Sequence, residues 1–233
     1  MWRPGALRHP SPNFGPRRGR VLPDLVVLHY TSMDSCEAAR DRLCAPEHKV
    51  SAHYLIDEDG TLLQLVDEAD RAWHAGVGAW GAVTDVNSRS IGIELFNDGT
   101  RPYSEPQIAV LERLLEDILA RHDIPPERVI GHSDMAPGRK IDPGRFFPWA
   151  RLAAAGLSVW PEAATSVGEA LEASPERLAR LVAALTRFGY RGNQALVLFD
   201  AFRQRFRPLA GVVDAADLAM AEELAARWPV RPD

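Results

Sequence analysis

Cysteine is scarce in this sequence, with only Cys36 and Cys44 among 233 residues. The two thiols lie eight positions apart in a polar stretch, and neither belongs to a CxxC pair. A structural zinc site built on cysteine is therefore excluded, and without a secretory signal the pair is more typical of free thiols than of a disulfide.

Long apolar runs are also missing, so no segment is expected to span a bilayer. Residues 1–20 are rich in Pro, Gly and Arg and lack the apolar stretch of a secretory signal. Taken by itself, this N-terminus predicts a cytoplasmic protein.

A positive charge excess is absent as well, because the formal net charge is -5. Nucleic-acid binders usually carry a basic surface, so no nucleic-acid partner is expected. The content of 46% hydrophobic and 25% charged residues is ordinary for a soluble globular protein, and we expect a monomer.

The sequence does contain an α/β pattern of predicted strands and helices. Short β-branched runs alternate with one strongly amphipathic segment, in which Ser104 and Gln107 form a predicted capping box. Strands are predicted over residues 24–28, 51–56, 61–66, 91–96 and 128–130, and helices over 35–43 and 104–122. Residues up to 23 are expected to be irregular. The order predicts a mixed β-sheet flanked by helices.

The composition changes after Trp149, where Ala, Leu, Arg and Glu dominate. Helices are predicted over residues 174–189, 193–206 and 214–228, with residues 160–167 as the linker. We therefore divide the chain into a domain at 1–162 and a small three-helix domain at 163–233.

The densest chemistry lies in residues 131–144, GHSDMAPGRKIDPG, which follow a predicted strand. Two Pro-Gly pairs predict a shaped loop rather than a helix. His132 and Asp142 have ligand atoms that suit zinc, but a zinc site needs at least a third ligand.

His29 supplies the third ligand in this interpretation. It ends the first buried strand, and ligands gather at strand ends in α/β proteins. A His, His, Asp set leaves one zinc position open, which is the pattern of a catalytic site. The alternative is a hydrogen-bonded core histidine.

Glu94 and Lys140 are candidate catalytic groups. Glu94 lies within an apolar strand, where burial would raise its pKa toward that of a useful general base. The alternative is an ion pair with Arg89 or Arg101. Lys140 could stabilise an oxyanion, or be a solvated loop lysine.

Other histidines carry weaker signals. His53 and Tyr54 alternate along a strand, so one of the two is expected in the core. Trp73 and His74 lie in a predicted loop over 71–80, where His74 could contact substrate or pack behind the site.

These motifs together resemble a known family, the zinc-dependent N-acetylmuramoyl-L-alanine amidases of type 2, and its AmiD and AmpD branch in particular. Peptidoglycan recognition proteins share the fold. The resemblance covers roughly residues 10–160 and rests on HYT at 29–31, SAHYLI at 51–56, WHAG at 73–76, NSRSIGIEL at 87–95 and the loop at 131–144.

The resemblance implies a hydrolase that takes part in peptidoglycan turnover and cleaves the amide between muramic acid, 1,6-anhydro or intact, and L-alanine. It implies zinc on His29, His132 and Asp142, with Glu94 and Lys140 as the catalytic pair.

Tyr54, Trp73, His74 and Arg139 are then expected to contact a peptidoglycan or muropeptide substrate. Residues 194–208 are similar to the small helical domain of AmiD-type enzymes, which makes a periplasmic or envelope location the alternative to the cytoplasm. The rival function is a peptidoglycan-binding module without catalysis, and a packing role is the rival for the C-terminal helices.

Overall fold

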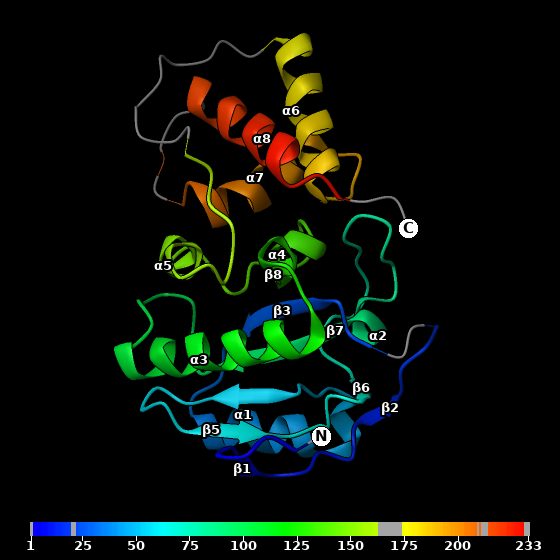
Figure 1. Ribbon diagram of the computed structural model, residues 1–233, viewed down its shortest axis with the longest axis vertical. Coiled ribbons are helices and arrows are strands. Elements are labelled where there is room, and N and C mark those ends of the chain that lie inside the picture. The colour runs from blue at the N-terminus through cyan, green and yellow to red at the C-terminus, as the bar shows by residue number, and fades with distance from the viewer. Residues whose placement is uncertain (1, 20–21, 163–173, 209, 211–213, 231–233) are drawn as a thin grey trace.

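The computed structural model describes residues 2–19, 22–162, 174–208, 210 and 214–230. A sheet with its flanking helices forms one part of the molecule, and three C-terminal helices lie together at one end of the long axis (Figure 1). The helices α4 and α5 lie between these two parts in the view of Figure 1.

The main sheet has six strands in the order β1-β5-β4-β7-β3-β8. Its strands span Leu7–Arg8 (β1), Leu25–Tyr30 (β3), Tyr54–Ile56 (β4), Leu62–Gln64 (β5), Ser90–Leu95 (β7) and Val129–Gly131 (β8). The pairs β4·β7, β7·β3 and β3·β8 are parallel, whereas β4·β5 is antiparallel. The predicted mixed sheet is confirmed, and the parallel centre is nearly all apolar because both of its faces are covered.

The helix α3 (Glu105–His122) covers one face of this sheet. Its apolar stripe packs on Val26, Leu28 and Ile93 in one buried cluster. Ser104 caps the helix by accepting a hydrogen bond from the backbone N–H of Gln107. The predicted reciprocal half of the capping box is wrong, because the Gln107 amide donates instead to carbonyls of Ile56 and Phe96 and ties the helix to the sheet.

The other face carries α1 (Cys36–Cys44), which packs on Leu55 and Leu65. Both cysteines are free thiols. The lead-in predicted to be irregular contains two short strands, β1 and β2 (Phe14–Pro16). The strand β2 pairs with β6 (Asp70–Ala72), so the loop predicted over residues 71–80 starts as a strand.

The remaining elements are short helices near the sheet and the three C-terminal helices. They span Val86–Arg89 (α2), His132–Met135 (α4), Trp149–Ala154 (α5), Pro175–Phe188 (α6), Ala195–Phe206 (α7) and Ala215–Arg227 (α8), with single 3-10 turns at Pro46–His48 and Pro126–Arg128. The three C-terminal helices are confirmed within two residues at each end.

The C-terminal helices share a core with the sheet. One buried cluster joins Leu25 and Val27 of β3 and Ile130 of β8 to Phe188 and Phe202 of the bundle. Most of the predicted linker, residues 163–167, lies outside the described residues. Across the described ranges, no helix combines the length and the apolar run that would let it cross a membrane.

Candidate metal centre

Three neighbouring parallel strands end at the site. In the register of β3 and β7, His29 pairs with Glu94, so the two side chains leave the same face of the sheet. On the other side of β3, Leu28 pairs with Gly131, which places His132 directly after the end of β8. Because the carboxyl ends of parallel strands meet at one edge, residues about forty to a hundred positions apart in sequence come together here.

The loop after β8 returns Asp142 to the same point. It begins with one turn of helix, α4, so the prediction that residues 131–144 contain no helix is wrong. The backbone N–H of Ser133 donates to the carbonyl of Asp142 at 2.9 Å, and that of Lys140 donates to the carbonyl of Ala136 at 3.1 Å. These bonds close the loop, so that His132 at its start and Asp142 near its end face each other.

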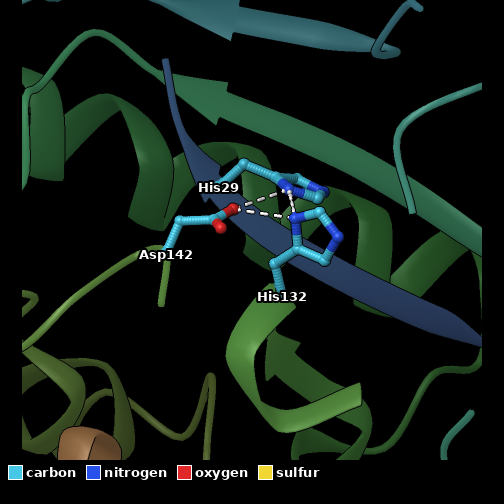
Figure 2. A group of neighbouring side chains, drawn as sticks. All are labelled: His29, His132 and Asp142. Atoms are coloured by element: carbon cyan, nitrogen blue, oxygen red, sulfur yellow. Dashed lines mark hydrogen bonds and ion pairs between the residues drawn. The ribbon is translucent and has the colours of Figure 1, made fainter. Parts of the chain in front are cut away.

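The side chains of His29, His132 and Asp142 point toward one another (Figure 2). The two Nδ1 atoms lie 2.9 Å apart, and Asp142 Oδ2 lies 3.0 Å from His29 Nδ1 and 2.9 Å from His132 Nδ1. All three side chains are buried. These are the only three His, Cys, Asp or Glu residues in the described ranges whose ligand atoms gather in this way.

The tautomer of His132 follows from its second nitrogen. Nε2 lies 2.9 Å from the carbonyl oxygen of Ala75 and 3.3 Å from Nη2 of Arg139, which itself donates to that carbonyl at 2.7 Å. The carbonyl is the shorter contact and only accepts, so we assign the proton to Nε2. Nδ1 therefore presents a lone pair toward His29 and Asp142. A backbone carbonyl behind the ring is a common means of holding a metal-binding histidine in one tautomer.

The tautomer of His29 follows from a longer chain of hydrogen bonds. Ser90 Oγ donates its single proton to the carbonyl of Val86 at 2.6 Å, so Ser90 Oγ must accept from His74 Nε2 at 3.1 Å. The other ring nitrogen of a neutral His74, Nδ1, then accepts from His29 Nε2 at 3.0 Å. His29 Nδ1 is left unprotonated and faces the site.

Burial keeps these two rings neutral. It lowers the pKa of His29 to about 4, helped by the neighbouring His132, and it lowers the pKa of His74 well below its ordinary value.

The donor set fits a metal ion. Two nitrogen lone pairs and one carboxylate oxygen converge at 2.9–3.0 Å, and no proton lies between the two nitrogens in the tautomers deduced above. Three such atoms repel one another unless a cation lies among them. Ligand atoms about 2.0–2.1 Å from a tetrahedral zinc ion would lie roughly 3.3 Å apart, close to the observed spacing.

Glu94 and Lys140 line the same cavity as the three candidate ligands, and its volume is about 560 Å³. Burial raises the pKa of Glu94 well above its ordinary value, Asp142 raises it further, and Lys140 opposes the shift. Glu94 Oε2 is shielded from solvent and has no hydrogen-bond partner among the described residues. A carboxyl group in this environment holds a proton more readily than an exposed one, which suits a general base.

The suggested ion pairs of Glu94 with arginine are not formed. Arg89 is paired with Asp24, and Arg101 is paired with Glu58 at 2.5 Å. The alternative interpretation of Glu94 as a structural ion-pair partner is therefore wrong.

Three of the four predicted substrate contacts line the cavity: Trp73, His74 and Arg139. Tyr54 is not among its lining residues. It pairs with Ile93 in the register of β4 and β7, so its side chain leaves the sheet on the face opposite Glu94. There its hydroxyl donates to Glu68 at 2.6 Å. His53 is equally buried, so the expectation that only one of the pair lies in the core is wrong.

Sequence reasoning missed the groups behind the ligands. Ser90 ends the relay from His29, and Gly92 leaves the space for it, because a Cβ at Gly92 would lie 2.4 Å from the His74 ring. Asp134 accepts from the backbone N–H of Gly131 at 2.7 Å and is also paired with the buried Arg205 of α7 at 2.8 Å. In the sequence, the one signal for these groups was the glycine Gly92 inside a predicted strand.

Comparison with known proteins gives consistent results. A family profile described as N-acetylmuramoyl-L-alanine amidase matches residues 18–145. The N-acetylmuramoyl-L-alanine amidase AmiD of Escherichia coli (strain K12) is 36% identical over 234 residues, which cover 88% of this chain and 83% of AmiD. The 1,6-anhydro-N-acetylmuramyl-L-alanine amidase AmpD of Haemophilus influenzae is 35% identical over 159 residues, which cover 60% of this chain and 86% of AmpD.

A solved structure shows the same architecture. The E. coli AmiD structure in complex with anhydro-N-acetylmuramic acid-L-Ala-D-gamma-Glu-L-Lys superposes with a TM-score of 0.80 at 33% identity. The superposition covers 94% of this chain and 93% of AmiD. The similarity therefore extends through the C-terminal helices as well as the sheet.

Proposed function

Because this chain belongs to the N-acetylmuramoyl-L-alanine amidase family, we propose that it hydrolyses the amide bond between the lactyl group of muramic acid and L-alanine, with zinc as its cofactor. The single observation that carries the proposal is the convergence of three unprotonated ligand atoms beside Glu94 and Lys140 in one cavity. Nitrogen and carboxylate ligands in a set of three suit a catalytic zinc ion.

His29, His132 and Asp142 would hold the zinc through Nδ1, Nδ1 and Oδ2, the atoms that face one another. When bound, zinc supplies Lewis-acid polarisation of the scissile carbonyl and makes water acidic enough to lose a proton near neutral pH. The remaining steps belong to side chains of this chain.

Glu94 would act first as the general base. Its carboxylate takes a proton from the attacking water, and its raised pKa makes it a stronger base than an ordinary carboxylate. The protonated Glu94 then returns this proton to the nitrogen of L-alanine, so the amine leaves in a neutral form. One carboxyl group thereby serves both halves of the reaction.

Lys140 would stabilise the negative charge that develops on the carbonyl oxygen. It lines the cavity with Asp142, two positions further along the loop, and its ammonium opposes the raised pKa of Glu94. Trp73 and Arg139 would contact the substrate at the walls of the cavity.

The substrate class is a muramoyl peptide, by similarity to the ligand of the E. coli AmiD structure, anhydro-N-acetylmuramic acid-L-Ala-D-gamma-Glu-L-Lys. A rival function on the same fold is peptidoglycan binding without hydrolysis. The complete donor set and the orphaned Glu94 oxygen support the enzyme instead, because a purely binding site has no need of an uncompensated carboxylate.

The test is mass spectrometry of digests of anhydromuropeptides and of intact muropeptides, together with metal analysis of the purified protein. We expect one zinc per chain and release of the free stem peptide. The variant Glu94→Gln should keep its zinc and lose roughly 10²–10⁴-fold in kcat. A zinc-loaded wild-type protein that releases no peptide would contradict the proposal, and near-normal turnover by the variant would contradict the role of Glu94.

A further inference from the structure

A second cavity adjoins the metal centre. Its volume is about 370 Å³, and it shares Gly138 and Arg139 with the cavity that holds the ligands. Its opposite wall comes from residues 191–198, which include the start of α7. The two walls approach closely at Gly138, where a Cβ would lie 2.8 Å from the side chain of Val197. The C-terminal helices therefore extend the walls of the site beyond the region that holds the metal ligands.

The second cavity is positively charged. Arg139 and Arg191 both line it, and no Asp or Glu is among its described lining residues. Arg139 donates to the carbonyl of Ala75 at 2.7 Å, and Arg191 donates to the carbonyl of Gly81 at 2.6 Å. Because each guanidinium has five N–H groups, these anchoring bonds orient the two side chains and leave donors for a ligand.

The lining also includes the amides of Asn193 and Gln194. Two oriented guanidinium groups without a carboxylate nearby favour an anionic ligand with planar oxygen atoms, and a carboxylate matches the guanidinium fork in both charge and geometry.

We propose that this second cavity binds the free α-carboxylate of the second residue of the stem peptide. This inference rests on the proposed function. In a stem that begins L-Ala-D-γ-Glu, the glutamate is linked onward through its side chain, so its α-carboxylate stays free. An extended residue spans about 3.3–3.6 Å, so this carboxylate lies about one residue beyond the scissile amide. The second cavity shares Gly138 and Arg139 with the cavity of the metal centre, which makes it the adjoining position for such a group. Arg191 is the specificity residue and comes from the C-terminal segment.

The experiment compares two substrates of equal size, N-acetylmuramoyl-L-Ala-D-γ-Glu-L-Lys and its counterpart in which the α-carboxylate is amidated to D-isoglutamine. The wild-type zinc enzyme should prefer the acid by about tenfold in kcat/KM, the ratio that one charge-assisted hydrogen bond supports at a partly exposed site. The difference should lie in KM, because the contact is the same in the ground state and the transition state.

The variant Arg191→Gln should lose this preference, because kcat/KM should fall more for the acid than for the amidated substrate. Arg191→Lys, which keeps the charge, should retain part of it. Arg187→Gln is the matched control, since Arg187 lies on α6 and lines a different cavity. Zinc content and melting temperature are measured for each variant to show that the fold and the metal centre are intact.

The outcomes separate this proposal from the proposed function. Equal hydrolysis of both substrates by the wild type, or an equal fall on both in Arg191→Gln, overturns the carboxylate site and leaves the amidase function standing. Hydrolysis of neither substrate by the zinc-loaded wild type overturns the amidase function and this subsite with it.

Discussion

The hydrogen-bond relay behind His29 leads to a quantitative prediction for zinc affinity. In His74→Phe the ring is retained in size, but Nε2 of the buried His29 loses its acceptor, which lies 3.0 Å away. A buried N–H without a partner costs about 1–3 kcal/mol. His29 can avoid that cost by moving the proton to Nδ1, but that atom must be unprotonated to bind zinc.

Either route weakens the metal site by a similar amount. Since about 1.4 kcal/mol corresponds to a tenfold change in an equilibrium constant, zinc should bind about 10- to 100-fold more weakly to His74→Phe. Ser90→Ala should give a smaller loss of the same kind. Without the hydroxyl, His74 is free to carry its proton on Nδ1, which again drives the proton of His29 toward the metal side.

Zinc affinity is measured by competition with a chelating indicator, which needs no catalytic turnover. His48→Gln is the matched control, because His48 is exposed and lies outside the cavity lining. Its dissociation constant should equal that of the wild type. If His74→Phe and Ser90→Ala also bind zinc with the wild-type constant, the tautomer assignment of His29 is refuted.

Two further predictions concern buried ion pairs of carboxylates that are not candidate metal ligands. Arg205→Met leaves the buried carboxylate of Asp134 without its ion-pair partner, so it should lower the free energy of unfolding in urea by about 3–5 kcal/mol. The control Arg180→Gln breaks an ion pair on the surface and should cost under about 1 kcal/mol. Equal losses in the two variants would contradict the role of burial. Burial acts to raise the pKa of Glu68, but hydrogen bonds from His122 and its other donors hold it below its usual range. A lowered folded-state pKa contributes stability that is complete above the unfolded value of about 4.3 and is lost as the pH falls toward the folded value. The free energy of unfolding should therefore fall as the pH is lowered below about 5. In Glu68→Gln this fall should be shallower when the free energy of unfolding is measured against pH. If the variant shows the same slope as the wild type, the lowered pKa of Glu68 is contradicted.

The three candidate ligands could be chosen from the sequence because local patterns mark them. His29 ends an apolar strand, and His132 and Asp142 bracket a loop that two Pro-Gly pairs shape. Local patterns cannot show what lies behind a ligand. The importance of Ser90 and Gly92 depends on where the ring of His74 comes to rest across the strand β7, and that position is set by tertiary packing.

Tyr54 also shows that local patterns cannot reveal tertiary position. Alternation correctly placed His53 and Tyr54 on opposite faces of their strand. Which face holds the site depends on the register with β7, where Tyr54 pairs with Ile93 and not with Glu94. A pairing between strands some forty residues apart leaves no mark in the local sequence, so the face could not be chosen in advance.

The boundary proposed at residue 162 separates segments of sequence rather than independent cores. Asp134 lies two residues after the candidate ligand His132, and its carboxylate accepts from Tyr190 at 2.5 Å and from Arg205 at 2.8 Å, both in the C-terminal segment. The same carboxylate accepts from Gly131 N–H, so it joins the end of β8 to α7. With Val197 of α7 also lining the second cavity, the C-terminal helices support the metal loop from behind and extend its walls in front. A role confined to anchoring a separate catalytic domain on peptidoglycan would require neither set of contacts.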